Sequence, residues 1–121
     1  MHIEELTDYC LNKKGTEAGF PFGGDTLVFK VMNKMFALTA TDSSPCKVNL
    51  KCLPDRAIML REQYEDITPG YHMSKVHWNT VNIEGDLPEN LIKELIDESY
   101  SLVVKSLTKK QKEVLDATEE F

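Results

Sequence analysis

The chain has 121 residues, of which 41% are hydrophobic and 28% are charged, a composition typical of one small globular domain with its own core. Its net charge of −6 argues against a strongly basic nucleic-acid-binding protein, and no apolar run is long enough for a membrane span. The N-terminus is acidic and the three cysteines form no CxxC pair, so we expect a cytoplasmic protein with reduced thiols.

Negative charge is concentrated in the two ends of the sequence. Residues 1–20 carry a net charge of −2 and residues 84–121 carry −5. Residues 21–83 carry +1, because they contain seven basic and six acidic side chains.

The first part of the chain predicts a helix followed by a loop. Apolar residues recur at helical spacing over residues 3–14, and Gly15 is expected to end that helix. Three glycines and a proline predict a loop over residues 18–25. We expect the rings of Phe20 and Phe22 to fold back from this loop onto the core.

Three short runs rich in β-branched and aromatic residues predict an antiparallel meander, with strands over residues 26–31, 35–41 and 46–51. Side chains alternate between the two faces of a strand, and this rule predicts which ones are buried. The residues expected to point toward the core are Leu27, Phe29, Val31, Phe36, Leu38, Ala40, Val48, Leu50 and Cys52. The opposite face carries Val28, Lys30, Met35, Lys47, Asn49 and Lys51.

The second half of the chain predicts three helices and a further strand. A helix begins at Pro54 and ends before Pro69, and a strand over residues 77–83 follows it. Pro88 begins a long helix with a core-facing stripe, and the capping-box pattern at Thr108 begins a short last helix.

The predicted order of elements is α, βββ, α, β, αα. This order predicts the α+β fold class, a two-layer sandwich in which helices cover one face of an antiparallel sheet. The other face is left open for a partner. We expect residues 1–121 to form a single domain, in which residues 108–121 are a short C-terminal helical extension.

Several short sequences resemble the MmcQ/YjbR-like family. They are Phe29-Lys30-Val31, Val48-Asn49-Leu50-Lys51, PGYHMSKVHWNTV at residues 69–81, and SYSLVV at residues 99–104. The resemblance extends from Ile3 to about Leu107. It implies the frataxin-like (CyaY-like) fold of small bacterial proteins that are often called double-wing and labelled DNA-binding. We therefore expect a monomeric binding module with DNA as its partner, without enzymatic activity or a cofactor.

The open face of the sheet is the candidate surface for nucleic acid. Alternation places Lys47, Lys51 and Trp78 on that face, where a ring could stack on bases while lysines hold phosphates. The candidate binding residues are Lys30, Lys34, Lys47, Lys51, Tyr71, His72, Lys75, His77 and Trp78. The more ordinary interpretation is that a loop or helix covers Trp78 and that the lysines form a solvated face.

Two alternatives involve the aromatic and histidine-rich segment. The first is a protein-binding or small-anion-binding domain without a nucleic-acid role, in which a pocket is closed by Tyr71, His72, Lys75, His77 and Trp78, with Tyr100 arriving from the long helix. The second is a metal or thiol site built from Cys46, Cys52, His72 and His77. We expect the two thiols to be structural instead, because they point inward and behave as small apolar groups.

The analogy with frataxin also raises iron binding by clustered carboxylates. The matching residue type occurs at Glu4, Glu5 and Asp8 at the start of the first helix. Because carboxylates at this position are the ordinary response to the helix dipole, we predict no metal site there.

Overall fold

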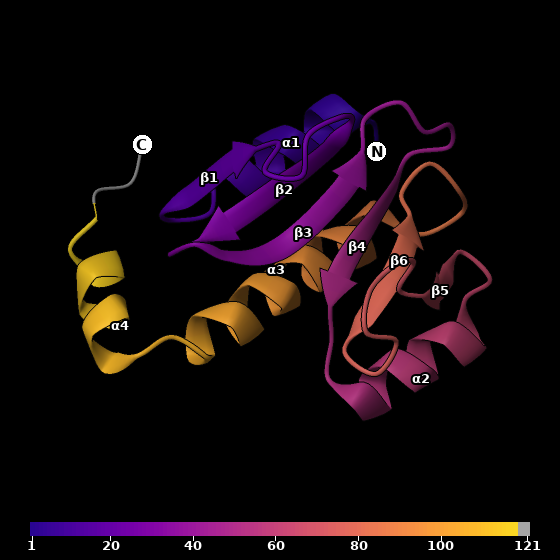
Figure 1. Ribbon diagram of the computed structural model, residues 1–121. Coiled ribbons are helices and arrows are strands. Elements are labelled where there is room, and N and C mark those ends of the chain that lie inside the picture. Colours follow the sequence, from indigo (N-terminus) through magenta and orange to yellow (C-terminus); the bar gives the residue numbers. More distant parts are fainter. Residues whose placement is uncertain (119–121) are drawn as a thin grey trace.

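The structure is a computed structural model that describes residues 1–118, and in this part of the chain six strands form one antiparallel sheet, in the order β1-β2-β3-β4-β6-β5 (Figure 1). The strands are β1 (Thr16–Gly19), β2 (Thr26–Val31), β3 (Lys34–Ala40), β4 (Lys47–Lys51), β5 (Ile67–Pro69) and β6 (Trp78–Asn82). The helices are α1 (Ile3–Leu11), α2 (Pro54–Gln63), α3 (Glu89–Lys105) and α4 (Lys109–Asp116). The α+β two-layer sandwich is therefore confirmed.

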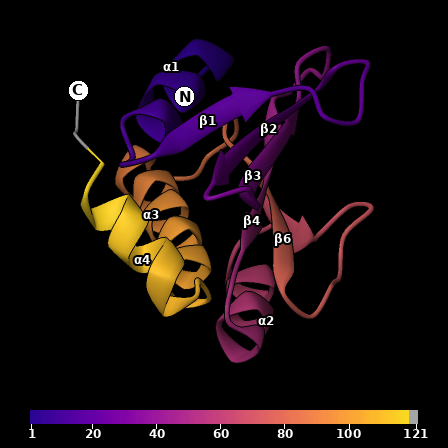
Figure 2. The same ribbon diagram turned by 60° about the vertical axis from the view of Figure 1, so that its left-hand side comes forward.

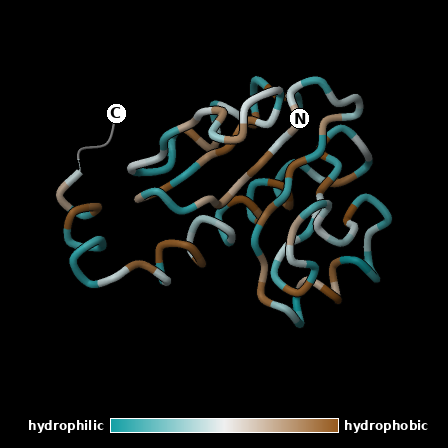
Figure 3. Tube along the Cα trace, viewed as in Figure 1, coloured by the Kyte–Doolittle hydropathy of each residue, from teal (hydrophilic) through white to brown (hydrophobic). Residues whose placement is uncertain are grey.

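The helices bury the main hydrophobic core against one face of the sheet. Figure 2 shows α1, α3 and α4 on the same side of it, while the opposite face carries loops rather than helices. Hydrophobic residues recur along the central strands and at intervals along the helices (Figure 3). The buried residues of α3 form the predicted stripe, which consists of Ile92, Leu95, Ile96, Ser99 and Val103.

A β-bulge in β3 divides this strand into two parts. Phe29 of β2 pairs with Ala37, but its neighbour Lys30 pairs with Met35, so the pairing register skips Phe36. An extra residue lets two successive side chains lie on one face. Phe36 and Ala37 are accordingly both fully buried in the core beneath the helices.

The bulge makes the predicted orientation of Leu38 and Ala40 wrong. Beyond the extra residue the alternation is reversed, so both side chains lie on the open face instead of facing the core. Leu38 packs there with Val28 and Trp78 in a second, smaller hydrophobic cluster, and Ala40 is exposed.

The observed elements differ from the prediction in four main places. Strands β1 and β5 were not predicted, because both are short. Their sequences, Thr-Glu-Ala-Gly and Ile-Thr-Pro, show little alternation of apolar and polar residues. Helix α1 ends at Leu11 and α2 at Gln63, several residues earlier than the sequence indicated. Gly15 therefore lies in the turn after α1 and does not end the helix itself, and Pro69 belongs to β5, the strand that follows α2.

The C-terminal extension contains helix α4. Its predicted capping box is present, since the hydroxyl group of Thr108 accepts a hydrogen bond from the backbone N–H of Gln111 at 3.1 Å. The last residues of the predicted extension, 119–121, lie outside the described part of the chain. Within residues 1–118, no helix combines the length and the apolar character that crossing a membrane requires.

Candidate functional site

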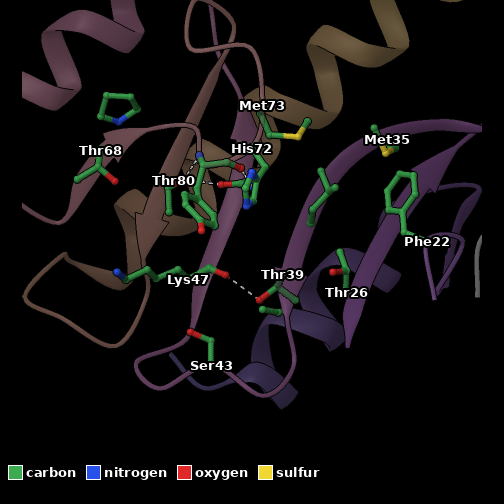
Figure 4. Close-up of a pocket in the computed structure, with 15 residues that line it drawn as sticks. Phe22, Thr26, Met35, Thr39, Ser43, Lys47, Thr68, His72, Met73 and Thr80 are labelled. Atoms are coloured by element: carbon green, nitrogen blue, oxygen red, sulfur yellow. Dashed lines mark hydrogen bonds between the residues drawn. The ribbon is translucent and has the colours of Figure 1, made fainter. Parts of the chain in front are cut away.

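The open face of the sheet carries a groove of about 680 Å³. Its floor is formed by side chains from β3, β4 and β6, among them Leu38, Asn49 and Thr80. Phe22, from the loop between β1 and β2, lines one side, and His72, from the segment between β5 and β6, lines another (Figure 4). This volume lies within the range of about 300–1,000 Å³ that is typical of sites for small organic molecules.

The groove has a polar part and an apolar part. In the view of Figure 4, Lys47 and Thr68 lie on the left, and Phe22 and Met35 lie on the right. Lys47 is the one lysine among the lining residues, and no Asp or Glu lines the groove within the described part of the chain. The electrostatic environment of the groove therefore favours a negatively charged group over a positive one.

Two hydrogen bonds hold the backbone of Tyr71 at the edge of the groove, and a third joins the two side chains that make them. The hydroxyl group of Thr80 accepts from the backbone N–H of Tyr71 at 2.9 Å and donates to the side-chain oxygen of Asn49. The side-chain amide of Asn49 donates to the carbonyl oxygen of Tyr71 at 3.1 Å. Two side chains of the groove floor thus position the backbone of one wall.

The two ring residues on this wall are exposed. The ring of Tyr71 is 69% exposed, and it contacts the ring of His72 with 4.0 Å between centroids. His72 has a φ of 59°, a left-handed conformation that is uncommon for residues other than glycine. The hydrogen bonds of Tyr71 hold the chain next to this conformation, so the wall is preformed without a ligand.

Trp78 lies on the open face, as alternation predicted, but it is covered. It is only 8% exposed and packs with Val28 and Leu38, with Met73 adding a further contact. The backbone N–H of Gly70 donates to the Trp78 carbonyl oxygen at 2.9 Å, which closes residues 70–77 over the tryptophan. The structure thus supports the more ordinary interpretation, in which Trp78 belongs to the hydrophobic packing.

The lysines predicted for one surface are spread over several environments. Lys47 and Lys51 share the open face, opposite Asn82 and Trp78 in the register of β4 and β6. Lys30 also lies on that face, where its cross-strand neighbour in the register of β1 and β2 is the acidic residue Glu17.

Two other predicted cations bond to the protein backbone. The ammonium group of Lys34 donates to the carbonyl oxygen of Ser106 at 3.2 Å, so this lysine faces the end of α3 and not the open face. The ammonium group of Lys75 donates to the carbonyl oxygen of Gly70 at 3.2 Å, within the segment between β5 and β6. His77 has an exposed side chain that does not line the groove. Of the candidate residues, the groove therefore brings together Lys47, Tyr71 and His72.

Two predictions about aromatic residues are wrong. Phe20 and Phe22 do not fold back onto the core, because they are 51% and 66% exposed. Tyr100 does not reach the Tyr71 segment. Its ring packs edge-on against Phe36 with 5.3 Å between centroids, and its hydroxyl group donates to the carbonyl oxygen of Lys14, on the helical side of the sheet.

Several groove residues were missed from the sequence. They are Phe22, Thr26, Leu38, Thr39, Ala40, Ser43, Thr68, Pro69 and Met73, whereas alternation had already placed Met35, Asn49 and Thr80 on the open face. Most belong to loops or to the part of β3 beyond the bulge, where alternation gives the wrong face. A usable signal was the phenylalanine pair in the glycine-rich loop, since a loop of eight residues offers little core to cover it.

The three cysteines are free and buried. Burial raises the pKa of the Cys10 thiol to about 12 and also raises the pKa values of Cys46 and Cys52. Cys46 and Cys52 lie in the core beneath the helices, on the other side of the sheet from His72. The predicted structural role of these thiols agrees with these positions.

Within residues 1–118, no three His, Cys, Asp or Glu side chains are grouped in a way that could hold a metal ion. The carboxylates at the start of α1 act locally. Glu5 accepts a hydrogen bond from the backbone N–H of His2 at 3.1 Å, and this bond lowers the pKa of Glu5. The acidic group thus caps the helix, as the helix dipole favours.

Comparisons with known proteins cover the region that contains the groove. The model of the YjbR family matches residues 11–102, a stretch that includes every lining residue. Protein YjbR of Escherichia coli (strain K12) is 35% identical over 115 residues, which cover 95% of this chain and 98% of that protein. Protein YyaQ of Bacillus subtilis (strain 168) is 46% identical over 55 residues, 46% of each chain.

Two crystal structures share the fold. The Deinococcus radiodurans protein DR2400, with the family domain DUF419, matches with a TM-score of 0.89 and 37% identity, over 98% of this chain and 91% of that one. A Pseudomonas syringae protein matches with a TM-score of 0.74 and 30% identity, over 84% of this chain and 98% of that one. On the family match and the identity to its relatives, the chain belongs to the YjbR family.

Proposed function

We propose that this protein is a non-enzymatic binding module and that the groove on the open face of its sheet holds a small organic ligand. The observation that carries the proposal is a groove of about 680 Å³ in which apolar side chains surround a few polar groups. This combination is the usual pattern of small-molecule sites, where apolar area supplies affinity and the polar groups fix orientation.

The hydrogen bonds of the groove support binding rather than catalysis. The hydroxyl group of Thr39 donates to the carbonyl oxygen of Lys47 at 2.7 Å, and that of Ser43 donates to the carbonyl oxygen of Pro45 at 3.0 Å. The Thr80 hydroxyl is engaged with Asn49. A catalytic hydroxyl needs a neighbouring base to accept its proton, and these three donate to structural acceptors instead.

The proposal can be tested by NMR titration with single-ring aromatic fragments of different charge. Backbone amides of residues 38–49 and 71–80 should shift, while those of α3 and α4 should stay. The matched variants are Ala40→Trp, which fills the groove from an exposed position, and Ala117→Trp, which adds the same ring at the end of α4. The first variant should abolish the shifts and the second should preserve them. Shifts confined to the helical side would contradict the proposal.

A second candidate ligand is single-stranded nucleic acid. The observation that favours it is the presence of two strongly exposed rings, Phe22 at 66% and Tyr71 at 69%, on the face that also carries Lys47 and Lys51. Seven of the fourteen acidic residues in the two acidic segments belong to α1 and α3, on the other side of the sheet (Figure 2). Bases stack on exposed rings while lysines contact phosphates.

Oligonucleotide titrations at low salt distinguish this candidate. If single strands bind, Tyr71→Ala should weaken binding by about 1–3 kcal/mol at all salt concentrations. Lys51→Gln should reduce the slope of log K against log salt by about 0.7. If neither single strands nor duplexes bind at low salt, nucleic acid is not the ligand.

For the location of the protein in the cell we infer the cytoplasm, which the three free cysteines support.

A further inference from the structure

We infer that the groove takes an elongated organic anion, with one negatively charged group at Lys47 and an apolar body that extends toward Phe22. The inference rests on the proposed function and names the chemical class of the ligand. It follows from two features of the lining: Lys47 is its single lysine, and the part around Phe22 and Met35 is apolar.

Lys47 is a cation without a counter-ion among the residues that the structure describes. None of the ion pairs within residues 1–118 involves it, and no Asp or Glu lines the groove. The hydroxyl group of Thr68 lines the same side of the groove (Figure 4). An ammonium group can hold a carboxylate by a charge-assisted hydrogen bond, and a hydroxyl group on the same side of the groove offers a further donor.

The other part of the groove offers apolar surface that the fold itself leaves exposed. Phe22 is 66% exposed, and Met35 and Leu38 continue the apolar lining toward the floor. Met73 adds a second thioether from the opposite wall. Methionine side chains are flexible and polarizable, so this part can adapt to an alkyl chain or an aromatic ring.

The single lysine also limits the charge of the ligand. A dianion or a polyphosphate would bring more negative charge into the groove than one ammonium group balances, and the other open-face cations, Lys30 and Lys51, do not line it. Negative charge beyond the first gains no attraction from a second cation in the groove, and like charges on the ligand repel each other. A monoanion therefore fits this lining better than a nucleotide does.

The test uses three probes that differ only in the head group: 4-phenylbutyrate, 4-phenylbutan-1-ol and 4-phenylbutylamine. Dissociation constants are measured by NMR titration of the groove amides at low ionic strength. We expect the carboxylate to bind about fivefold more tightly than the alcohol, the size expected of one partly exposed ion pair. The amine should bind least tightly.

Two lysine variants form a matched pair. Lys47→Gln should reduce the affinity of the carboxylate to that of the alcohol and leave the alcohol unchanged. Lys51→Gln should change neither, because Lys51 has the same charge, strand and face but does not line the groove. Phe22→Ala should weaken all three probes by a similar factor, since the phenyl group is common to them.

The outcomes separate this inference from the proposed function. Equal binding of the three probes at the groove amides, or tightest binding of the amine, would overturn the anion assignment and leave the groove as a ligand site. An equal loss of carboxylate affinity in both lysine variants would also overturn it, since the attraction would then belong to the face as a whole. Absence of groove shifts with all three probes at millimolar concentration would overturn both proposals.

Discussion

The hydroxyl group of Ser99 in α3 donates a hydrogen bond to the carbonyl oxygen of Phe36 at 2.5 Å. The same hydroxyl accepts a hydrogen bond from the backbone N–H of Lys51 at 2.8 Å. Phe36 is the residue that the strand register skips, and the regular pairing of β3 with β4 stops at Ala37 and Leu50. One buried side chain from the helical layer therefore satisfies two backbone groups that the interrupted sheet leaves without strand partners.

We expect Ser99→Ala to destabilise the protein markedly. The change leaves two buried backbone groups unsatisfied at a position that is 0% exposed, and each such group costs about 1–3 kcal/mol. Urea unfolding should show a loss of about 2–4 kcal/mol in the free energy of unfolding. Ser101→Ala, on the exposed side of the same helix, is the control and should change the stability by less than about 0.5 kcal/mol. Similar values for the two variants would mean that the bridging role is wrong.

Gly70→Ala should disturb the segment that covers Trp78. A Cβ atom at Gly70 would lie 2.7 Å from the Cβ of Trp78 and 2.9 Å from its carbonyl oxygen, which forces the backbone to move. Overpacking of this kind costs about 1–3 kcal/mol. Trp78 is the single tryptophan, so its fluorescence should shift to longer wavelength as water reaches the ring.

Gly19→Ala is the matched control for that change. A Cβ atom at Gly19 would meet nothing within 4 Å, so we expect no fluorescence change and an unchanged or slightly higher melting temperature. If Gly70→Ala behaved in the same way, Trp78 would not be held by its contact with Gly70.

The stability should fall at alkaline pH because of the buried Cys10 thiol. Its pKa rises from about 9.0 in the unfolded chain to about 12 in the folded protein, so unfolding releases a proton between these values. The contribution is fully present below pH 9 and decreases as the pH rises toward 12. Urea unfolding between pH 7 and pH 11 measures it, and Cys10→Ala should flatten the decline. An equally steep decline in the variant would assign it to other groups, such as Tyr9, whose pKa burial also raises to about 12.

Thr80→Val should loosen the Tyr71 wall of the groove. The change keeps the side-chain shape but removes the acceptor for the Tyr71 N–H and the donor to Asn49, so we expect a loss of about 1 kcal/mol in stability. Amide hydrogen exchange at Tyr71 should become faster. Thr68→Val is the control, because Thr68 lines the same groove from an exposed position and takes no part in these bonds. Unchanged exchange at Tyr71 in Thr80→Val would show that the wall is held by other contacts.

Much of the fold could be predicted from periodicity. The stripe of α3 and the meander of β2, β3 and β4 follow from side-chain spacing, because burial of one face imposes it. The bulge at Phe36 could not be predicted, since it changes neither composition nor spacing in the sequence. Because the alternation of side chains was followed through the bulge without a break, Leu38 was assigned to the wrong face of the sheet.

The groove was harder to predict than the sheet. Alternation gave the face of Lys47 and Trp78 correctly. It could not show that residues 70–77 cover Trp78, because that depends on the left-handed conformation of His72 and on bonds to Asn49 and Thr80. Walls made by loops depend on tertiary contacts, which spacing in a single sequence does not reveal.

The order of the strands places β5 at one edge of the sheet. This strand has only three residues, so it presents few backbone hydrogen-bonding groups to a neighbouring chain. The N–H of Gly70 and the carbonyl oxygen of Asp66 bond to β6, so the backbone of Ile67 and Pro69 points outward. The N–H of Ile67 is already bonded to the carbonyl oxygen of Tyr64 at 3.2 Å, and proline has no N–H. An incoming strand would find carbonyl oxygens but no free donor here, which protects this edge of the sheet against pairing with another chain.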